Sequence, residues 1–396
     1  QVFPDEFHIK TLEQVLSSYT KASPAVDMKP IMVTLMNRLA NYMTNSEESP
    51  VDLGGIDIFS LFRTHLQQIL ERALDPQAPA PGAAPAAVDI AAPLEVQAAF
   101  LQFTVSLYPD KVHYVDIILG SAAELVAKYF EKVGGGVGQK LSGNAGDRVM
   151  DLLSAPLKSL GLGVLEMEHY PTLLSFLGFQ TRKQVALSMV SNVVEDDRPI
   201  SSVEAATSLF NFITPLLKDE EDTPQDEGKD KDVFVHEQHQ VCKLVHQARN
   251  EDTDVVFQIL GVMRGFFGQG GPLRMVHTLQ PTYYAAMGLI PRIRARERRR
   301  SADGEELPPP AVSVKKVFQF MHKTNTAMVK EAPEVALQQW LVAGLAADQA
   351  DRNSESPGAY EPICYEFLTQ ALICFEEEIS ESSRQYEGIF TLVGTL

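Results

Sequence analysis

The residues best suited to chemistry are three histidines and a cysteine that lie close together in the sequence. His239, Cys242 and His246 stand at positions i, i+3 and i+7, so a helix would place them on one face, and both residue types bind zinc. His236 and His239 are three positions apart, whereas the H-E-x-x-H motif of zinc proteases needs four. We therefore interpret the cluster as a polar, partly buried helix stripe and predict no metal site.

Two glycine-rich runs have the composition of a phosphate-binding loop but not its context. Gly134–Lys140 lacks the G-K-[ST] ending, and it follows a helical pattern rather than a strand. Gly268–Gly271 also follows a helical pattern, so both runs are interpreted as turns between helices. No serine has the context of a nucleophile elbow, and the acids Glu376–Glu378 fit a solvated helix face. We predict no catalytic residues, no cofactor and no enzymatic activity.

A basic run stands out in an otherwise acidic chain. Arg292–Arg300 holds six arginines and one glutamate, whereas the whole chain has a formal net charge of −18. That overall charge argues against general binding of nucleic acids or anionic membranes, and no aromatic residues alternate with the arginines to stack on bases. The run is interpreted either as a solvated helix end or as a contact for an acidic protein surface, with nucleic acid or lipid the less favoured alternatives.

Helices must position these residues, because the apolar pattern is helical along almost the whole chain. Apolar side chains recur at i, i+3, i+4 and i+7, as in Val256, Ile259, Leu260 and Met263. Convincing period-2 alternation is absent. The sequence predicts an all-α fold of about eighteen helices, arranged as an α-solenoid of HEAT-like antiparallel helix pairs.

Three segments interrupt the helical pattern and are predicted to be disordered or flexible insertions. Residues 75–93 are mostly alanine and proline, residues 218–232 hold eight acids against three lysines, and residues 301–312 contain a triple proline. A length of 396 residues suggests two or three domains. Because a solenoid tolerates insertions at its turns, we predict a single continuous solenoid over residues 1–396, with separate domains as the alternative.

The number of cysteines and the two ends of the chain indicate its cellular compartment and whether it is part of a longer protein. Cys242, Cys364 and Cys374 are too few for a disulfide framework, which favours a reducing compartment such as the cytoplasm. No apolar run reaches the roughly 18 residues that would span a bilayer. The chain starts at Gln1 without a methionine and ends at Leu396 just after an apolar run, so we expect it to be part of a longer protein.

Several stretches along the chain are specific enough to compare with a known family. They are Phe3–His8, Tyr108–Val112, Tyr114–Asp116, Arg182–Lys183, Ser191–Val193, Arg249–Asp254, Phe266–Gly271, Tyr365–Leu368, Glu377–Ser380 and Gly394–Thr395. In these residues and their order, the chain resembles the middle and C-terminal part of the large subunit of retromer, the vacuolar protein sorting-associated protein 35 family. The arginine-dense run and the prolines after it depart from that family.

The resemblance implies a scaffold rather than an enzyme. In that family the C-terminal solenoid holds a metallophosphoesterase-fold subunit, vacuolar protein sorting-associated protein 29, within an endosomal coat that returns transmembrane cargo. The resemblance further implies a cytoplasmic protein, peripheral on the endosomal membrane and attached through sorting nexin adaptors, with an arrestin-like subunit bound by an N-terminal part that this chain lacks. The alternative is a generic HEAT-type adaptor or transport receptor.

The resemblance also implies arches in which two large subunits pair through their C-terminal solenoids. A two-fold contact is self-complementary, so acids on one copy must meet bases on the other. An acidic turn and several basic positions are suitable opposites, and the alternative is that they are ordinary helix-end charges. The predicted homodimer contact residues are Glu251, Asp252, Asp254, Arg292, Arg294, Lys315 and Lys316.

Overall fold

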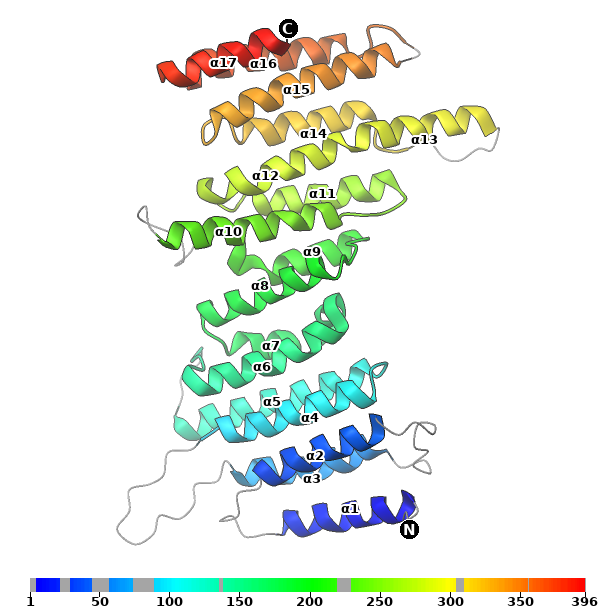
Figure 1. The fold of residues 1–396 in the computed structure, drawn as a ribbon, viewed down its shortest axis with the longest axis vertical. Coiled ribbons are helices and arrows are strands. Elements are labelled where there is room, and N and C mark those ends of the chain that lie inside the picture. Colours follow the sequence, from blue (N-terminus) through cyan, green and yellow to red (C-terminus); the bar gives the residue numbers. More distant parts are fainter. Residues whose placement is uncertain are drawn as a thin grey trace. The chain divides into compact units, whose positions relative to one another are not determined.

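A computed structural model of the chain is built from a succession of helices (Figure 1). It describes residues 5–21, 29–44, 57–73, 89–134, 138–218, 229–303, 310–354 and 356–395. The chain divides into two compact units, residues 1–188 and residues 189–396. The prediction of a single continuous solenoid therefore stays a prediction.

The first unit stacks its helices in two layers. Its α-helices are α1 (Asp5–Thr20), α2 (Lys29–Thr44), α3 (Ile58–Ala73), α4 (Ala91–Leu107), α5 (Val112–Val133), α6 (Gly143–Leu160) and α7 (Tyr170–Ser175), and α8 (Phe179–Glu195) begins in this unit and ends in the next. Helix α2 packs on α4 and α4 on α6, while α1 packs on α3 and α3 on α5. Contact between alternate helices is the pattern of stacked helix pairs.

The second unit repeats this arrangement. Its α-helices are α9 (Val203–Phe212), α10 (Lys229–Lys243), α11 (Thr253–Phe267), α12 (Pro272–Met287), α13 (Leu289–Asp303), α14 (Val314–Thr326), α15 (Pro333–Arg352), α16 (Glu361–Glu378) and α17 (Ser382–Thr395). Helix α9 packs on α11 and α11 on α13, while α10 packs on α12 and α12 on α14. In the described residues, β-structure is limited to two isolated bridges. The predicted all-α solenoid fold is confirmed.

Buried polar side chains tie neighbouring repeats of the second unit together. Arg274 is 1% exposed, donates a 2.8 Å hydrogen bond to the carbonyl of Leu216, and lies over the ring of Phe234 at 4.8 Å. The hydroxyl of Tyr283 donates to the carbonyl of Gln339 at 2.5 Å. Each bond joins segments more than 50 positions apart in the sequence. Because buried polar groups are costly to leave unpaired, these bonds fix the register of one repeat on the next.

The edges of the three predicted insertions are ordered, which corrects their boundaries. Helix α4 begins at Ala91, because Asp89 accepts the Ala91 N–H at 2.9 Å and a proline is tolerated in a first turn. Helix α10 already includes residues 229–232, and α13 continues to Asp303. Val312 is buried. The remaining insertion residues, 75–88, 219–228 and 304–309, lie outside the described part of the chain.

Candidate interaction surfaces

The acidic turn before α11 meets a basic side chain of the same chain. Asp252 caps the helix by accepting the Asp254 N–H at 2.9 Å, and Arg296 of α13 donates to the Asp252 carboxylate at 2.6 Å. The second carboxylate, Asp254, lies 3.8 Å from Arg296. The hydrogen bond from the Asp254 backbone N–H, and after it Arg296, lowers the pKa of Asp252 below its usual value. Arg296 was not among the predicted contact residues.

The Asp254 carboxylate also anchors the segment that leads into α14. Its two oxygens accept the backbone N–H groups of Ala311 and Val312 at 2.8 and 2.9 Å. Lys316, one turn into the next helix, donates to the Ala311 carbonyl at 3.0 Å. Asp254 therefore acts as a structural bridge between α11 and α14 and is 16% exposed.

The other predicted basic residues lie near by, at the start of α13 and of α14. Arg292 is exposed and donates to the carbonyl of Asn250 at 2.7 Å. The guanidinium of Arg294 lies 4.9 Å from the ring centre of Tyr360, and the Lys315 ammonium lies 5.8 Å from the same ring. Both distances allow cation–π attraction. The structure therefore gathers the predicted acids and bases around α13, with Glu251, Arg292, Lys315 and Lys316 exposed.

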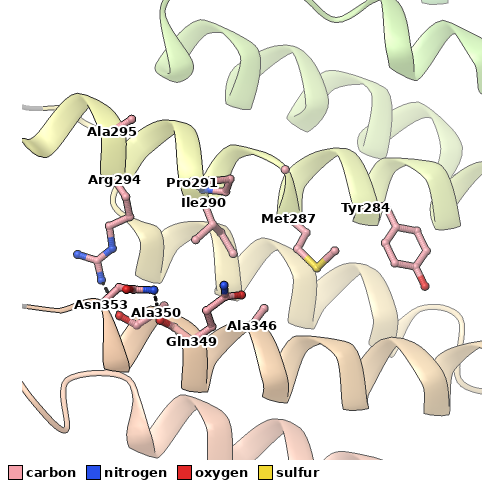
Figure 2. Close-up of a pocket in the computed structure, with 11 residues that line it drawn as sticks. Tyr284, Met287, Ile290, Pro291, Arg294, Ala295, Ala346, Gln349, Ala350 and Asn353 are labelled. Carbon is pink, nitrogen blue, oxygen red and sulfur yellow. Dashed lines mark hydrogen bonds between the residues drawn. The ribbon is translucent and has the colours of Figure 1, made fainter. Parts of the chain in front are cut away.

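A groove of about 480 Å³ lies between α12, α13 and α15. Figure 2 shows Tyr284 and Arg294 at its opposite ends, with Met287, Ile290 and Ala346 between them. Arg294 donates to the carbonyl of Ala350 at 3.3 Å, which fixes the basic end of the groove. Its lining residues are Tyr284, Met287, Gly288, Ile290, Pro291, Arg294, Ala295, Ala346, Gln349, Ala350 and Asn353. An apolar floor with polar groups at the rim is typical of a protein-binding surface.

The groove was not predicted from the sequence. Tyr284 and Met287 share the helical spacing of core residues, and apolar spacing alone does not separate core from groove positions. Tyr284 is nevertheless 37% exposed, and Leu345 on α15 is 50% exposed. In the sequence, only Gly288 with Ile290 and Pro291 indicates an irregular surface here. These residues lie at the break between α12 and α13.

Comparison with known proteins shows the family of the chain that carries these surfaces. The family model described as vacuolar protein sorting-associated protein 35 matches residues 1–396. The chain belongs to the vacuolar protein sorting-associated protein 35 family. It is 30% identical over 399 residues to vacuolar protein sorting-associated protein 35B of Arabidopsis thaliana, with 100% of this chain and 46% of that protein covered.

More distant relatives give the same match. The vacuolar protein sorting-associated protein 35 of Dictyostelium discoideum is 28% identical over 400 residues, covering 100% of this chain and 47% of that protein. The Schizosaccharomyces pombe protein of that name is 21% identical over 430 residues, with 100% and 47% covered. The chain therefore spans about half the length of the curated relatives it matches.

Several stretches that carried the resemblance to the vacuolar protein sorting-associated protein 35 family lie at turns that join repeats. Tyr114 donates to Asp57 at 2.9 Å, and Arg249 forms a 2.6 Å ion pair with Asp197. At Gly270 an added Cβ would lie 2.5 Å from the carbonyl oxygen of Leu217, so only glycine allows this approach. These residues therefore shape the stack, and their contacts are structural.

The histidine and cysteine cluster of this family member is not gathered into a metal-binding geometry. His236, His239, Cys242 and His246 do not belong to the one group of metal-capable side chains that converges within the described ranges. His239 instead packs edge-on against His277 of α12, with ring centres 5.2 Å apart. Burial, and after it His239, lowers the pKa of His277.

Among the helices that the structure describes, none combines the length and the apolar character needed to cross a bilayer.

Proposed function

We propose that this chain is a non-enzymatic scaffold subunit of the retromer endosomal coat, acting in vacuolar and endosomal protein sorting. In this proposal it binds the metallophosphoesterase-fold subunit, vacuolar protein sorting-associated protein 29, and pairs with a second copy of itself. Sorting nexin adaptors hold the assembled coat on the cytoplasmic face of the endosomal membrane, and the arrestin-like subunit binds a part of the protein outside this chain. The observation that carries the proposal is the family match over all 396 residues.

The groove between α12, α13 and α15 is the proposed contact for the metallophosphoesterase-fold subunit. Its floor is apolar through Met287, Ile290 and Ala346, whereas Arg294 and Gln349 provide polar groups at the rim. Tyr284, at one end of the groove, and Leu345 on α15 are exposed apolar side chains. Burial of apolar surface is the main favourable term in protein association, so a partner that covers this groove would gain from its apolar floor.

A pull-down with the purified metallophosphoesterase-fold subunit tests this part of the proposal. The unmodified chain is expected to retain the partner, and Met287→Glu is expected to weaken binding by at least about tenfold, because a buried, unpaired carboxylate is costly. Val133→Glu is the matched control, since Val133 is a 50% exposed valine on α5 and lies in the other unit. Equal loss in both variants would contradict the groove assignment, and no retention by any form would favour a generic HEAT-type adaptor.

Self-association is proposed to use the charges gathered around α13. Within one copy Asp252 and Asp254 face Arg296, whereas Glu251, Arg292, Lys315 and Lys316 are exposed and can meet opposite charges on a second copy. Charge reversal of Lys315 and Lys316 to glutamate is expected to lower the dimer fraction in analytical ultracentrifugation. Added salt should weaken the contact, because exposed charges are screened over about 10 Å at 0.1 M. An unchanged dimer fraction in the variant would refute this contact.

A further inference from the structure

A second cluster of chemically capable side chains lies in the first unit, where α5 meets the segment before α7. Asp116 belongs to α5, and Glu168 and His169 directly precede α7. One ligand atom from each of the three residues lies within 4.8 Å of the others, and this is the one such group of three among the residues the structure describes. The two segments are 53 positions apart in sequence.

The imidazole of His169 is held in place from two sides. One oxygen of the Asp116 carboxylate accepts the His169 backbone N–H at 3.0 Å, and the other lies 3.0 Å from Nδ1 of the ring. The ring itself packs on α5 at Gly120, where an added Cβ would lie 3.0 Å from Cδ2 and from Nε2. The missing side chain at Gly120 therefore makes room for the ring and leaves Nδ1 turned toward the carboxylate.

We propose that Asp116, Glu168 and His169 form a binding site for a divalent transition-metal ion, with Zn²⁺ as the best fit. An imidazole nitrogen and two carboxylates are common zinc ligands, and the two negative charges match the charge of the ion. Bond lengths of about 2.0–2.2 Å around a tetrahedral ion separate the ligand atoms by roughly 3.4 Å. The Asp116–His169 pair needs a shift of only a few tenths of an ångström to reach that spacing.

The remaining steps of binding need only small changes. Glu168 is exposed, so its side chain can turn toward the ion without disturbing the core. Binding through Nδ1 requires the imidazole tautomer with its proton on Nε2, which leaves the lone pair of Nδ1 facing the ion. The backbone bond from His169 to Asp116 stays in place and orients both ligands. Water takes the fourth coordination position, because the cluster of Asp116, Glu168 and His169 is accessible to solvent.

The site is independent of the proposed scaffold function and lies in the other unit from the groove. A bound ion would join α5 to the segment before α7 and so stabilise the first unit. The alternative is that Asp116 and His169 form only a structural turn. Glu168 separates the two interpretations. A purely structural turn does not require the Glu168 carboxylate, whereas the metal site requires it as a ligand.

Zinc titration of the untagged, chelator-treated chain by isothermal calorimetry tests the proposal. We expect one Zn²⁺ per chain. Glu168→Gln, at an exposed position, should weaken binding by at least about tenfold, and His169→Asn should abolish it. A His239→Asn, Cys242→Ala double variant is the control and should bind as the unmodified chain does. Circular dichroism of each variant establishes that the helices are intact.

Three results would overturn the proposal. One is a dissociation constant weaker than about 100 μM for the unmodified chain. Another is full binding by Glu168→Gln. The third is loss of binding only in the control variant, which would move the ion to the histidine and cysteine cluster of α10. Cobalt substitution gives an independent readout, since ligation by Cys242 produces a thiolate-to-cobalt charge-transfer band that ligation by nitrogen and oxygen does not.

Discussion

Replacing Asp254 by alanine should destabilise the second unit. The carboxylate accepts the backbone N–H groups of Ala311 and Val312 and lies near Arg296. A hydrogen bond to a charged acceptor at a partly buried site contributes about 2 kcal/mol, and the exposed bond to Ala311 contributes about 0.5 kcal/mol. The exposed ion pair adds little, so Asp254→Ala should cost about 2.5 kcal/mol.

Urea denaturation followed by tryptophan fluorescence measures this cost. Trp340 on α15 is the single tryptophan of the chain and is 1% exposed, so its emission reports the unfolding of the second unit. Asp254→Asn keeps one neutral acceptor oxygen and should lose about half as much stability as the alanine variant. Hydrogen exchange should accelerate at both Ala311 and Val312 in the alanine variant, because both N–H groups lose their acceptor, and at only one of them in Asp254→Asn.

Glu251→Ala is the matched control for this prediction. Glu251 is an exposed acid in the same turn, and its removal should change the unfolding free energy by no more than about 0.5 kcal/mol. If Asp254→Ala proves as stable as Glu251→Ala, the bridge from α11 to α14 contributes no stability and the reasoning is wrong.

Three further predictions concern single side chains of the second unit. Burial, and then His239, lowers the pKa of His277, so protonation favours the unfolded state. The unfolding free energy should therefore fall as the pH drops through about 6.5. His277→Gln should reduce this fall in the same urea assay. Gly388→Val should lower the melting temperature and expose α17 to protease, because a Cβ at Gly388 lies 2.9 Å from the Phe375 ring and overpacking costs about 1–3 kcal/mol. Burial raises the pKa of Cys374 to about 11, so iodoacetamide near pH 7 should modify it only after unfolding, as mass spectrometry of the labelled peptide would show.

The helical fold could be predicted because its signal is local. Apolar residues such as Val256 and Ile259 recur at the helical period, and the structure buries both within α11. Helix edges were harder, because alanine, proline and mixed charge also occur in first turns. Ala91 and residues 229–232 were therefore assigned to insertions although they begin α4 and α10.

The candidate sites depend on contacts between residues far apart in the sequence, which spacing does not reveal. The acids Glu251, Asp252 and Asp254 and the bases Arg292, Arg294, Lys315 and Lys316 suggested a contact between two copies, but complementary charge says nothing about which copy supplies the partner. The structure pairs Asp252 with Arg296 of the same chain at 2.6 Å. Likewise Asp116 and His169 carry no shared motif, and only the packing of α5 against α7 brings them together.

The most direct test of the scaffold account is the binding of the purified chain to the purified metallophosphoesterase-fold subunit, measured by isothermal calorimetry at several temperatures. The account predicts a one-to-one complex with a negative heat-capacity change, because binding buries the apolar groove. It also predicts that Met287→Glu weakens binding whereas Val133→Glu does not. Absence of binding heat, together with separate elution of the two proteins in size-exclusion chromatography, would contradict the account.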